Sequence, residues 1–145
     1  MSGEIFVDTN VLVCARDASE PGKQKKAVAW MGYLWEARRG RMSLQVLSEY
    51  YNTITNKLRP GMKAELARQD VRHLMAWRPL PLDSVVIEGA WTVQDKHGLS
   101  WWDSLIVSAT HVSARRYHLT EDFEDGRDFD GIEVVNPFLR APHSI

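Results

Sequence analysis

The sequence predicts an α/β fold with a mainly parallel central sheet. Short apolar runs of strand-forming residues alternate with longer segments in which apolar residues recur every three or four positions. This alternation is typical of parallel sheets, because two parallel strands need a long crossover between them. At 145 residues, with 44% hydrophobic and 26% charged residues, the chain is expected to form one domain over residues 1–145.

The first expected strand covers residues 5–7, an apolar run that suits a strand buried on both faces. Asp8 follows it directly, and a helical turn is expected over residues 10–15. A carboxylate at the end of a buried strand is costly unless it has a partner. Ligands of open α/β sheets bind at this edge of the sheet. Asp8 is therefore either a functional acid or the cap of the following helix.

Five further helices are expected, the first four ending at a Gly or Pro and the last opening at Ser100. Their expected ranges are 23–39, 45–58, 63–77, 84–97 and from Ser100 onward. Large residues placed on their inward faces include Trp30, Trp35, Leu66, Met75, Trp91 and Trp102. Strands are expected at 42–44, 117–120 and 132–135, and an acidic loop at 121–130.

Composition excludes several classes of protein. The single cysteine, Cys14, rules out an internal disulfide and a zinc site built mainly from thiolates, so a cytoplasmic location is expected. No run reaches the roughly 18 apolar residues of a membrane helix, and acids interrupt the only apolar stretch that could resemble a signal peptide. Residues 1–78 carry 13 basic and 8 acidic residues, and residues 79–145 carry 5 and 11. This split indicates a basic surface beside an acidic site, unless the halves interleave in space.

Four acids follow predicted strands or lie near the starts of predicted helices. Glu49 belongs to a polar stripe of its helix, and Asp103 lies in a first turn where Ser100 and Asp103 also resemble a capping box. Asp122 follows the strand at 117–120, and Asp125 stands three residues further on. Each acid alone has an ordinary role on a solvated face, in a cap or in a turn. Glu49, Asp103 and Asp122 are expected to converge with Asp8 at the carboxyl edge of the sheet.

Clustered carboxylates repel one another and take up protons unless a cation neutralises them. Mg²⁺ or Mn²⁺ suits such hard oxygen ligands. The expected site can activate water and stabilise the charge that builds on a phosphodiester under attack. The basic residues of the first half are candidates for holding the phosphate backbone: Lys23, Lys25, Lys26, Arg38, Arg39, Arg41, Lys57 and Arg59.

Four segments, at residues 6–12, 45–52, 99–106 and 119–126, resemble the PIN-domain ribonucleases, in particular the VapC-type toxins of toxin–antitoxin pairs. The stretch at 134–138 is also similar to the end of many members. The resemblance implies an α/β/α sandwich with a parallel sheet and a Mg²⁺- or Mn²⁺-dependent endoribonuclease. It also implies a cognate antitoxin that covers the active site, and a toxin homodimer.

Carried over residue by residue, the resemblance implies that Asp8 and Asp103 are the principal metal ligands. Glu49 matches the third acid, which orients water or metal, and Asp122 matches the more variable fourth acid, with Asp125 as a substitute. The supporting polar positions correspond to Asn10 and Ser104.

Two other interpretations stay open at this point. A haloacid-dehalogenase-like phosphatase also has an Asp after its first strand, but it needs a second Asp where this chain has Asn10. A catalytically silent binding module would use the acids only as caps and turns. The five histidines show no zinc spacing and are interpreted as surface or core residues. The two tryptophans beside Asp103, Trp101 and Trp102, are interpreted as core anchors rather than platforms for stacked bases.

Overall fold

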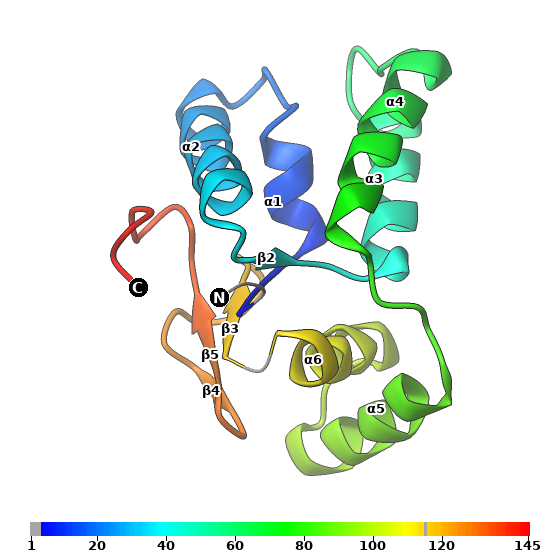
Figure 1. Ribbon diagram of the computed structural model, residues 1–145, viewed down its shortest axis with the longest axis vertical. Helices are drawn as coiled ribbons and strands as arrows, with labels where there is room; N and C mark the ends of the chain where they lie inside the picture. The colour runs from blue at the N-terminus through cyan, green and yellow to red at the C-terminus, as the bar shows by residue number, and fades with distance from the viewer. Residues whose placement is uncertain (1–3, 115) are drawn as a thin grey trace.

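The computed structural model describes residues 4–114 and 116–145, and its core is a five-stranded sheet in the order β2-β1-β3-β5-β4 (Figure 1). All neighbouring strands are parallel except β4 and β5. The strands are β1 (Ile5–Val7), β2 (Gly40–Arg41), β3 (Tyr117–Leu119), β4 (Asp128–Phe129) and β5 (Ile132–Val135). Both β1 and β3 are buried at every position, as expected for central parallel strands, although β3 carries a histidine, His118, between Tyr117 and Leu119.

Helices cover both faces of this sheet. In Figure 1, α1 and α2 lie above the sheet and α5 and α6 below it, while α3 and α4 form a hairpin to one side. The bounds are α1 (Thr9–Cys14), α2 (Pro21–Ala37), α3 (Leu44–Asn56), α4 (Ala64–Leu74), α5 (Ser84–His97) and α6 (Trp101–Ser113), with a 3₁₀ turn η1 (Met75–Trp77) after α4. The expected α/β/α arrangement with a mainly parallel sheet is confirmed. Within the described ranges, no helix is both long and apolar enough to cross a membrane.

Polar caps fix where the helices begin. Asp8, Ser43, Asp83 and Ser100 each accept a hydrogen bond from a backbone N–H in the first turn of α1, α3, α5 and α6. The expected strand at 42–44 was wrong, because Ser43 caps α3 and the strand precedes it as β2. The acidic loop at 121–130 was also incomplete, since residues 128–129 form β4 against β5.

Several large residues that helical periodicity placed in the core lie on the surface instead. Trp35, Leu66, Met75, Trp91 and Trp102 are all exposed, and Trp102 retains 62% of its accessible surface. Periodicity was correct for Trp30, which is fully buried and donates from its indole N–H to the carbonyls of Pro137 and Arg140. Periodicity identifies the apolar residues on one side of a helix but not whether another element covers each of them.

Gly40 is required by the close packing of β2 against η1. A Cβ atom at this position would lie 2.2 Å from the Trp77 ring, so Gly40→Ala is expected to destabilise the fold by about 2 kcal/mol through overpacking. The control is Gly32→Ala, because nothing lies within 4 Å of its added Cβ in the middle of α2. That change is expected to stabilise the protein by about 0.5–1 kcal/mol. Urea unfolding of both variants measures the difference, and equal midpoints would contradict this packing argument.

Candidate active site

The four expected acids line one hollow of about 440 Å³ at the carboxyl edge of the sheet. Asp8 follows β1, Asp122 comes shortly after β3, Glu49 lies on α3 and Asp103 lies in the first turn of α6. The remaining lining residues are mostly polar: Thr9, Asn10, Val13, Gln45, Asn52, Thr53, Lys57, Trp102 and Ile106. The expected convergence of acids from four separate segments is therefore present in the structure.

Asp8 is held rigidly at the floor of this hollow. Its side chain is buried, and Oδ1 accepts a hydrogen bond from the Thr9 N–H at 2.7 Å. Burial alone would raise the pKa of Asp8, but the hydrogen bond and charge interaction with His118, helped by Thr9, lower it below its usual range. A carboxylate offers about four lone-pair positions, so two of these remain available after both hydrogen bonds. Asp8 is therefore the cap of α1 and also an acid with a lowered pKa that lines the hollow.

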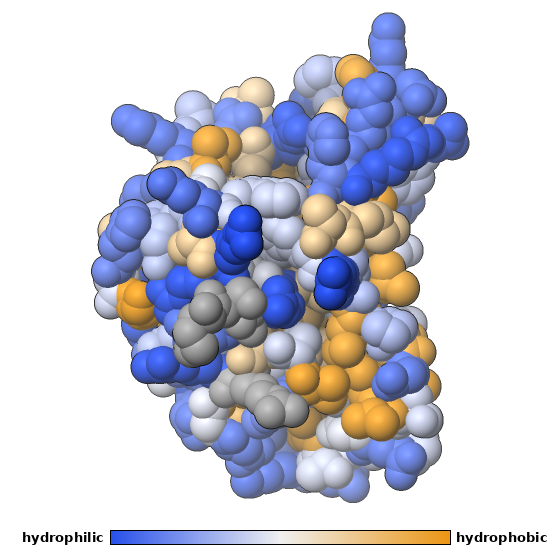
Figure 2. All heavy atoms as spheres, viewed as in Figure 1, coloured by the Kyte–Doolittle hydropathy of each residue, from blue (hydrophilic) through white to orange (hydrophobic). Residues whose placement is uncertain are grey.

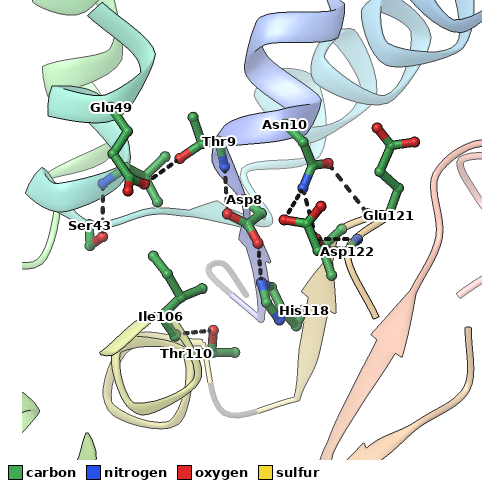
Figure 3. A network of polar contacts seen from close by, with 12 residues as sticks. Asp8, Thr9, Asn10, Ser43, Glu49, Ile106, Thr110, His118, Glu121 and Asp122 are labelled. Carbon is green, nitrogen blue, oxygen red and sulfur yellow. Dashed lines mark hydrogen bonds and ion pairs between the residues drawn. The ribbon is translucent and has the colours of Figure 1, made fainter. Parts of the chain in front are cut away.

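His118 is the site residue that the sequence did not reveal. It lies on β3, fully buried, with Nε2 3.1 Å from Asp8 Oδ2 (Figure 3). Since an ionised carboxylate only accepts hydrogen bonds, the Nε2 atom carries the proton. Phe6 and Phe123 contact the imidazole ring and fix its position. The sequence offered no signal for this contact, because it depends on the parallel register of β1 and β3, which places His118 beside the strand that ends at Asp8.

Asp122 is positioned by Asn10 and Thr120. The Asn10 amide donates to Asp122 Oδ2 at 3.2 Å and to Thr120 Oγ1 at 2.8 Å, which joins α1 to the turn after β3 (Figure 3). Burial raises the pKa of Asp122, and the nearby charges of Asp8 and Asp103 raise it further, against the Asn10 hydrogen bond. This mutual repulsion is what clustered acids produce where no cation compensates them.

Glu49 and Asp103 are the other two acids that line the hollow, and they come from α3 and α6. Glu49 Oε1 accepts a hydrogen bond from Thr9 Oγ1 at 2.9 Å, so α3 is tied to the start of α1 (Figure 3). The Asp103 N–H donates to the Ser100 hydroxyl at 3.1 Å. The capping arrangement leaves the Asp103 carboxylate to line the hollow.

Trp102 lies beside Asp103 at the rim of the same hollow. The expectation that it anchors the core was wrong, because its ring is exposed. Trp101, in contrast, packs against the core. A ring exposed next to the acids is available to stack on a ligand.

Asp125, the alternative fourth acid, lies elsewhere. Its carboxylate accepts from the Asn136 N–H at 2.8 Å and pairs with Arg140 Nε at 3.1 Å. These contacts tie the turn after β3 to the end of β5, and Asp125 does not line the hollow. Asp122 is the acid that faces Asp8.

The donor chemistry of the hollow fits a divalent cation. In the part of the chain that the structure describes, no three acids or histidines stand close enough together to coordinate one ion directly. Among residues 4–114 and 116–145, the buried side-chain atoms without a hydrogen-bond partner are Gln45 Nε2, Ser104 Oγ and His118 Nδ1, and of these Ser104 Oγ and His118 Nδ1 are able to accept a hydrogen bond from a water ligand of an ion. Mg²⁺ keeps several of its waters and needs only one or two carboxylates as direct ligands, so the acids that line the hollow suit a hydrated ion.

The basic residues proposed for RNA binding lie in different parts of the structure. Lys57 lines the acidic hollow. Lys23 pairs with Glu121 and Arg39 with Glu4, so their charges are largely neutralised. Arg38 and Arg41 lie around a different hollow, at the start of β2.

A parallel sheet with acids gathered at its carboxyl edge places this chain among α/β proteins whose active site lies at that edge. The sequence matches the PIN domain family over residues 5–114, more than half of its length, so the chain belongs to the PIN-domain family. A comparison with curated proteins gives no match. PIN domains are generally nucleases that use divalent metal ions and act on RNA or DNA. Family membership therefore favours a nuclease over a haloacid-dehalogenase-like phosphatase.

Proposed function

We propose that this protein is a metal-dependent endoribonuclease that acts as the toxin of a toxin–antitoxin pair. The observation that carries the proposal is the meeting of Asp8, Glu49, Asp103 and Asp122 in one hollow. Asp8, Asp103 and Asp122 would hold a hydrated Mg²⁺ or Mn²⁺, with one or two of the carboxylates binding it directly and the rest through its water ligands. A divalent ion bound there supplies Lewis-acid stabilisation of the charge on the attacked phosphate and lowers the pKa of bound water.

The chain's own residues contribute orientation and recognition. Glu49 lies across the hollow with one oxygen held by Thr9, so its second oxygen is available to orient the attacking water. Asn10 holds Asp122 through a hydrogen bond, and the buried hydroxyl of Ser104, next to Asp103 in the chain, has no hydrogen-bond partner among the described residues and is available to support a ligand of this site. The exposed ring of Trp102 suits the base of a single-stranded RNA, since bases outside a duplex stack on aromatic side chains.

Two apolar surfaces support the proposed protein partners. A groove of about 780 Å³ has apolar walls from Leu12, Val28, Met31, Trp35 and Leu74 and a polar floor where Arg16 and Tyr50 bind Asp70. It suits an amphipathic segment of a cognate antitoxin. Hydrophobic residues also gather over α5 and α6 (Figure 2), where Val85 is exposed, and this surface suits a second copy of the chain in a homodimer.

Cleavage of total RNA tests the proposed activity. We expect fragments in the presence of Mn²⁺ and none after a chelator is added. Titration with Mn²⁺ in the absence of RNA distinguishes the alternative of a silent binding module. If no Mn²⁺ binds and no RNA is cut, that alternative is favoured; cleavage that persists in chelator would contradict the metal dependence.

Asp122 and Asp125 form a matched pair that identifies the fourth acid. Asp122→Asn removes a charge from the hollow, and we expect cleavage to fall about a hundredfold, as for other groups that stabilise developing charge. Asp125→Asn removes a charge of the same type outside the hollow, where its partner is Arg140. We expect it to affect thermal stability more than cleavage. The initial rate of cleavage at saturating Mn²⁺ is the measurement, and the reverse order of effects would assign the role to Asp125.

A further inference from the structure

A second charged hollow lies at the opposite edge of the sheet from the acids. Its volume is about 630 Å³, and it is formed by the end of α2, β2 and the residues around η1. Gly40 of β2 pairs with Ile5 at the start of β1, whereas Asp8 follows the end of β1. The two hollows are therefore separate, although β1 spans only roughly 10 Å between these edges.

Three arginines surround this second hollow. Arg38, Arg41 and Arg78 all line it, and no acid is among the lining residues. Within residues 4–114 and 116–145, none of the three forms an ion pair. In Figure 2 the surface over the end of α2 and β2 includes strongly hydrophilic residues. Three uncompensated guanidinium groups around one hollow attract an anion, and guanidinium geometry matches phosphate oxygens.

The backbone at two of these arginines is unusual. Arg38 ends α2 with a φ of 55°, and Arg78 ends η1 with a φ of 52°. These are left-handed positions at which glycine is favoured, because a side chain there is strained. Both positions nevertheless carry a long cationic side chain directed at the same hollow. We therefore expect that Arg38→Gly and Arg78→Gly leave the ends of α2 and η1 folded as they are.

Two tryptophans form an aromatic wall beside the arginines. The rings of Trp35 and Trp77 lie 5.2 Å apart at an angle of 59°. Trp77 is buried, with its ring against Gly40, whereas Trp35 is 42% exposed and lines both this hollow and the groove of about 780 Å³ described above. An aromatic face next to cations is how proteins hold bases and phosphates of single-stranded nucleic acid together.

We propose that this arginine–tryptophan hollow binds a nucleotide, with the phosphate on Arg38 and Arg78 and the base on Trp35. The nucleotide can be part of an RNA strand, in which case the hollow is a second contact for the proposed RNA substrate, or a free nucleotide. An acidic protein segment is disfavoured as the ligand, because acidic side chains have no base that could stack on the tryptophan rings. That the nucleotide belongs to an RNA strand rests on the proposed ribonuclease function. Binding of a nucleotide to this hollow does not itself require that RNA is cleaved.

The test measures binding in chelator, so that no RNA is cut. Fluorescence anisotropy with a labelled single-stranded RNA of about 16 nucleotides reports the strand source, and calorimetry with adenosine 5′-monophosphate reports the free nucleotide. The first variant is Arg38→Gly with Arg78→Gly, which removes two charges and relaxes two strained positions. The matched control is Lys63→Ala with Arg72→Ala, which removes two exposed charges on or next to α4.

If the ligand is an RNA strand, we expect the arginine variant to reduce the salt dependence of RNA binding, with a slope smaller by about 0.7, as for one phosphate that is no longer neutralised. Its melting temperature should equal or exceed that of the parent protein. Trp35→Leu should weaken binding by about tenfold through loss of stacking. If instead adenosine monophosphate binds and the same variants abolish its binding, the free nucleotide is the ligand.

Two results would overturn the proposal. One is that both probes bind the arginine variant and its control equally. The other is that polyglutamate competes as well as RNA while Trp35→Leu has no effect, since this would mean an acidic protein surface is recognised. Failure of RNA cleavage in Mn²⁺, with binding to this hollow intact, would refute the proposed nuclease and leave the nucleotide site standing.

Discussion

Asp8→Asn is expected to lower RNA cleavage by about a thousandfold while the protein remains folded. The carboxylate lies at the floor of the acidic hollow, and loss of its charge removes several kcal/mol of stabilisation from a bound divalent ion. The asparagine carbonyl still accepts from the Thr9 N–H, so the start of α1 keeps its cap. Initial cleavage rates across a Mn²⁺ titration give the effect, and the melting temperature reports the fold.

The matched control for this prediction is Asp83→Asn. Asp83 caps α5 with the same type of hydrogen bond, to the Val86 N–H at 3.1 Å, but it does not line the acidic hollow. Asparagine is as good a cap as aspartate, so Asp83→Asn should leave both melting temperature and cleavage nearly unchanged. Cleavage by Asp8→Asn at the level of Asp83→Asn would show that Asp8 is only a cap.

The sequence was sufficient to predict the sheet and the meeting of the acids. Periodicity located the helices within a few residues, and the rule that strand ends gather at one edge brought Asp8, Asp122, Glu49 and Asp103 together. Apolar periodicity did not locate β2, since a strand of two residues carries no periodic signal. It also failed for Trp35 and Trp102, because periodicity identifies an apolar stripe but not how much of that stripe another element covers.

His118 was not predictable for a different reason. A histidine inside a short apolar strand has the same local pattern whether it packs silently or contacts a functional group. Its role depends on strand register, which pairs it with Phe6 and brings its ring to Asp8. Choosing between Asp122 and Asp125 also needed the structure, because the turn after β3 directs one acid to the hollow and the other to Arg140.

His118→Leu is expected to weaken Mn²⁺ binding by about 10–100-fold, the usual effect of losing a hydrogen bond to a metal ligand. Leucine fills the apolar space beside Phe6 and Phe123 but cannot donate to Asp8 Oδ2. Asp8 then loses the main interaction that offsets its burial, and its carboxylate is oriented only by the remaining bond from the Thr9 N–H. Calorimetric titration with Mn²⁺ measures the affinity, and melting curves without metal measure the cost to the fold.

His118→Gln separates positioning from packing. The glutamine amide reaches a position similar to that of the imidazole Nε2, so it can restore the donor to Asp8 while it fits the aromatic surroundings less well than histidine. If His118 positions Asp8, Gln recovers most of the Mn²⁺ affinity that Leu loses, even where its melting temperature is the lower of the two. If the ring serves only the core, affinity does not differ between the variants and only the melting temperatures change. That pattern would reduce His118 to a buried core residue and leave Asp8 to be oriented by the Thr9 backbone alone.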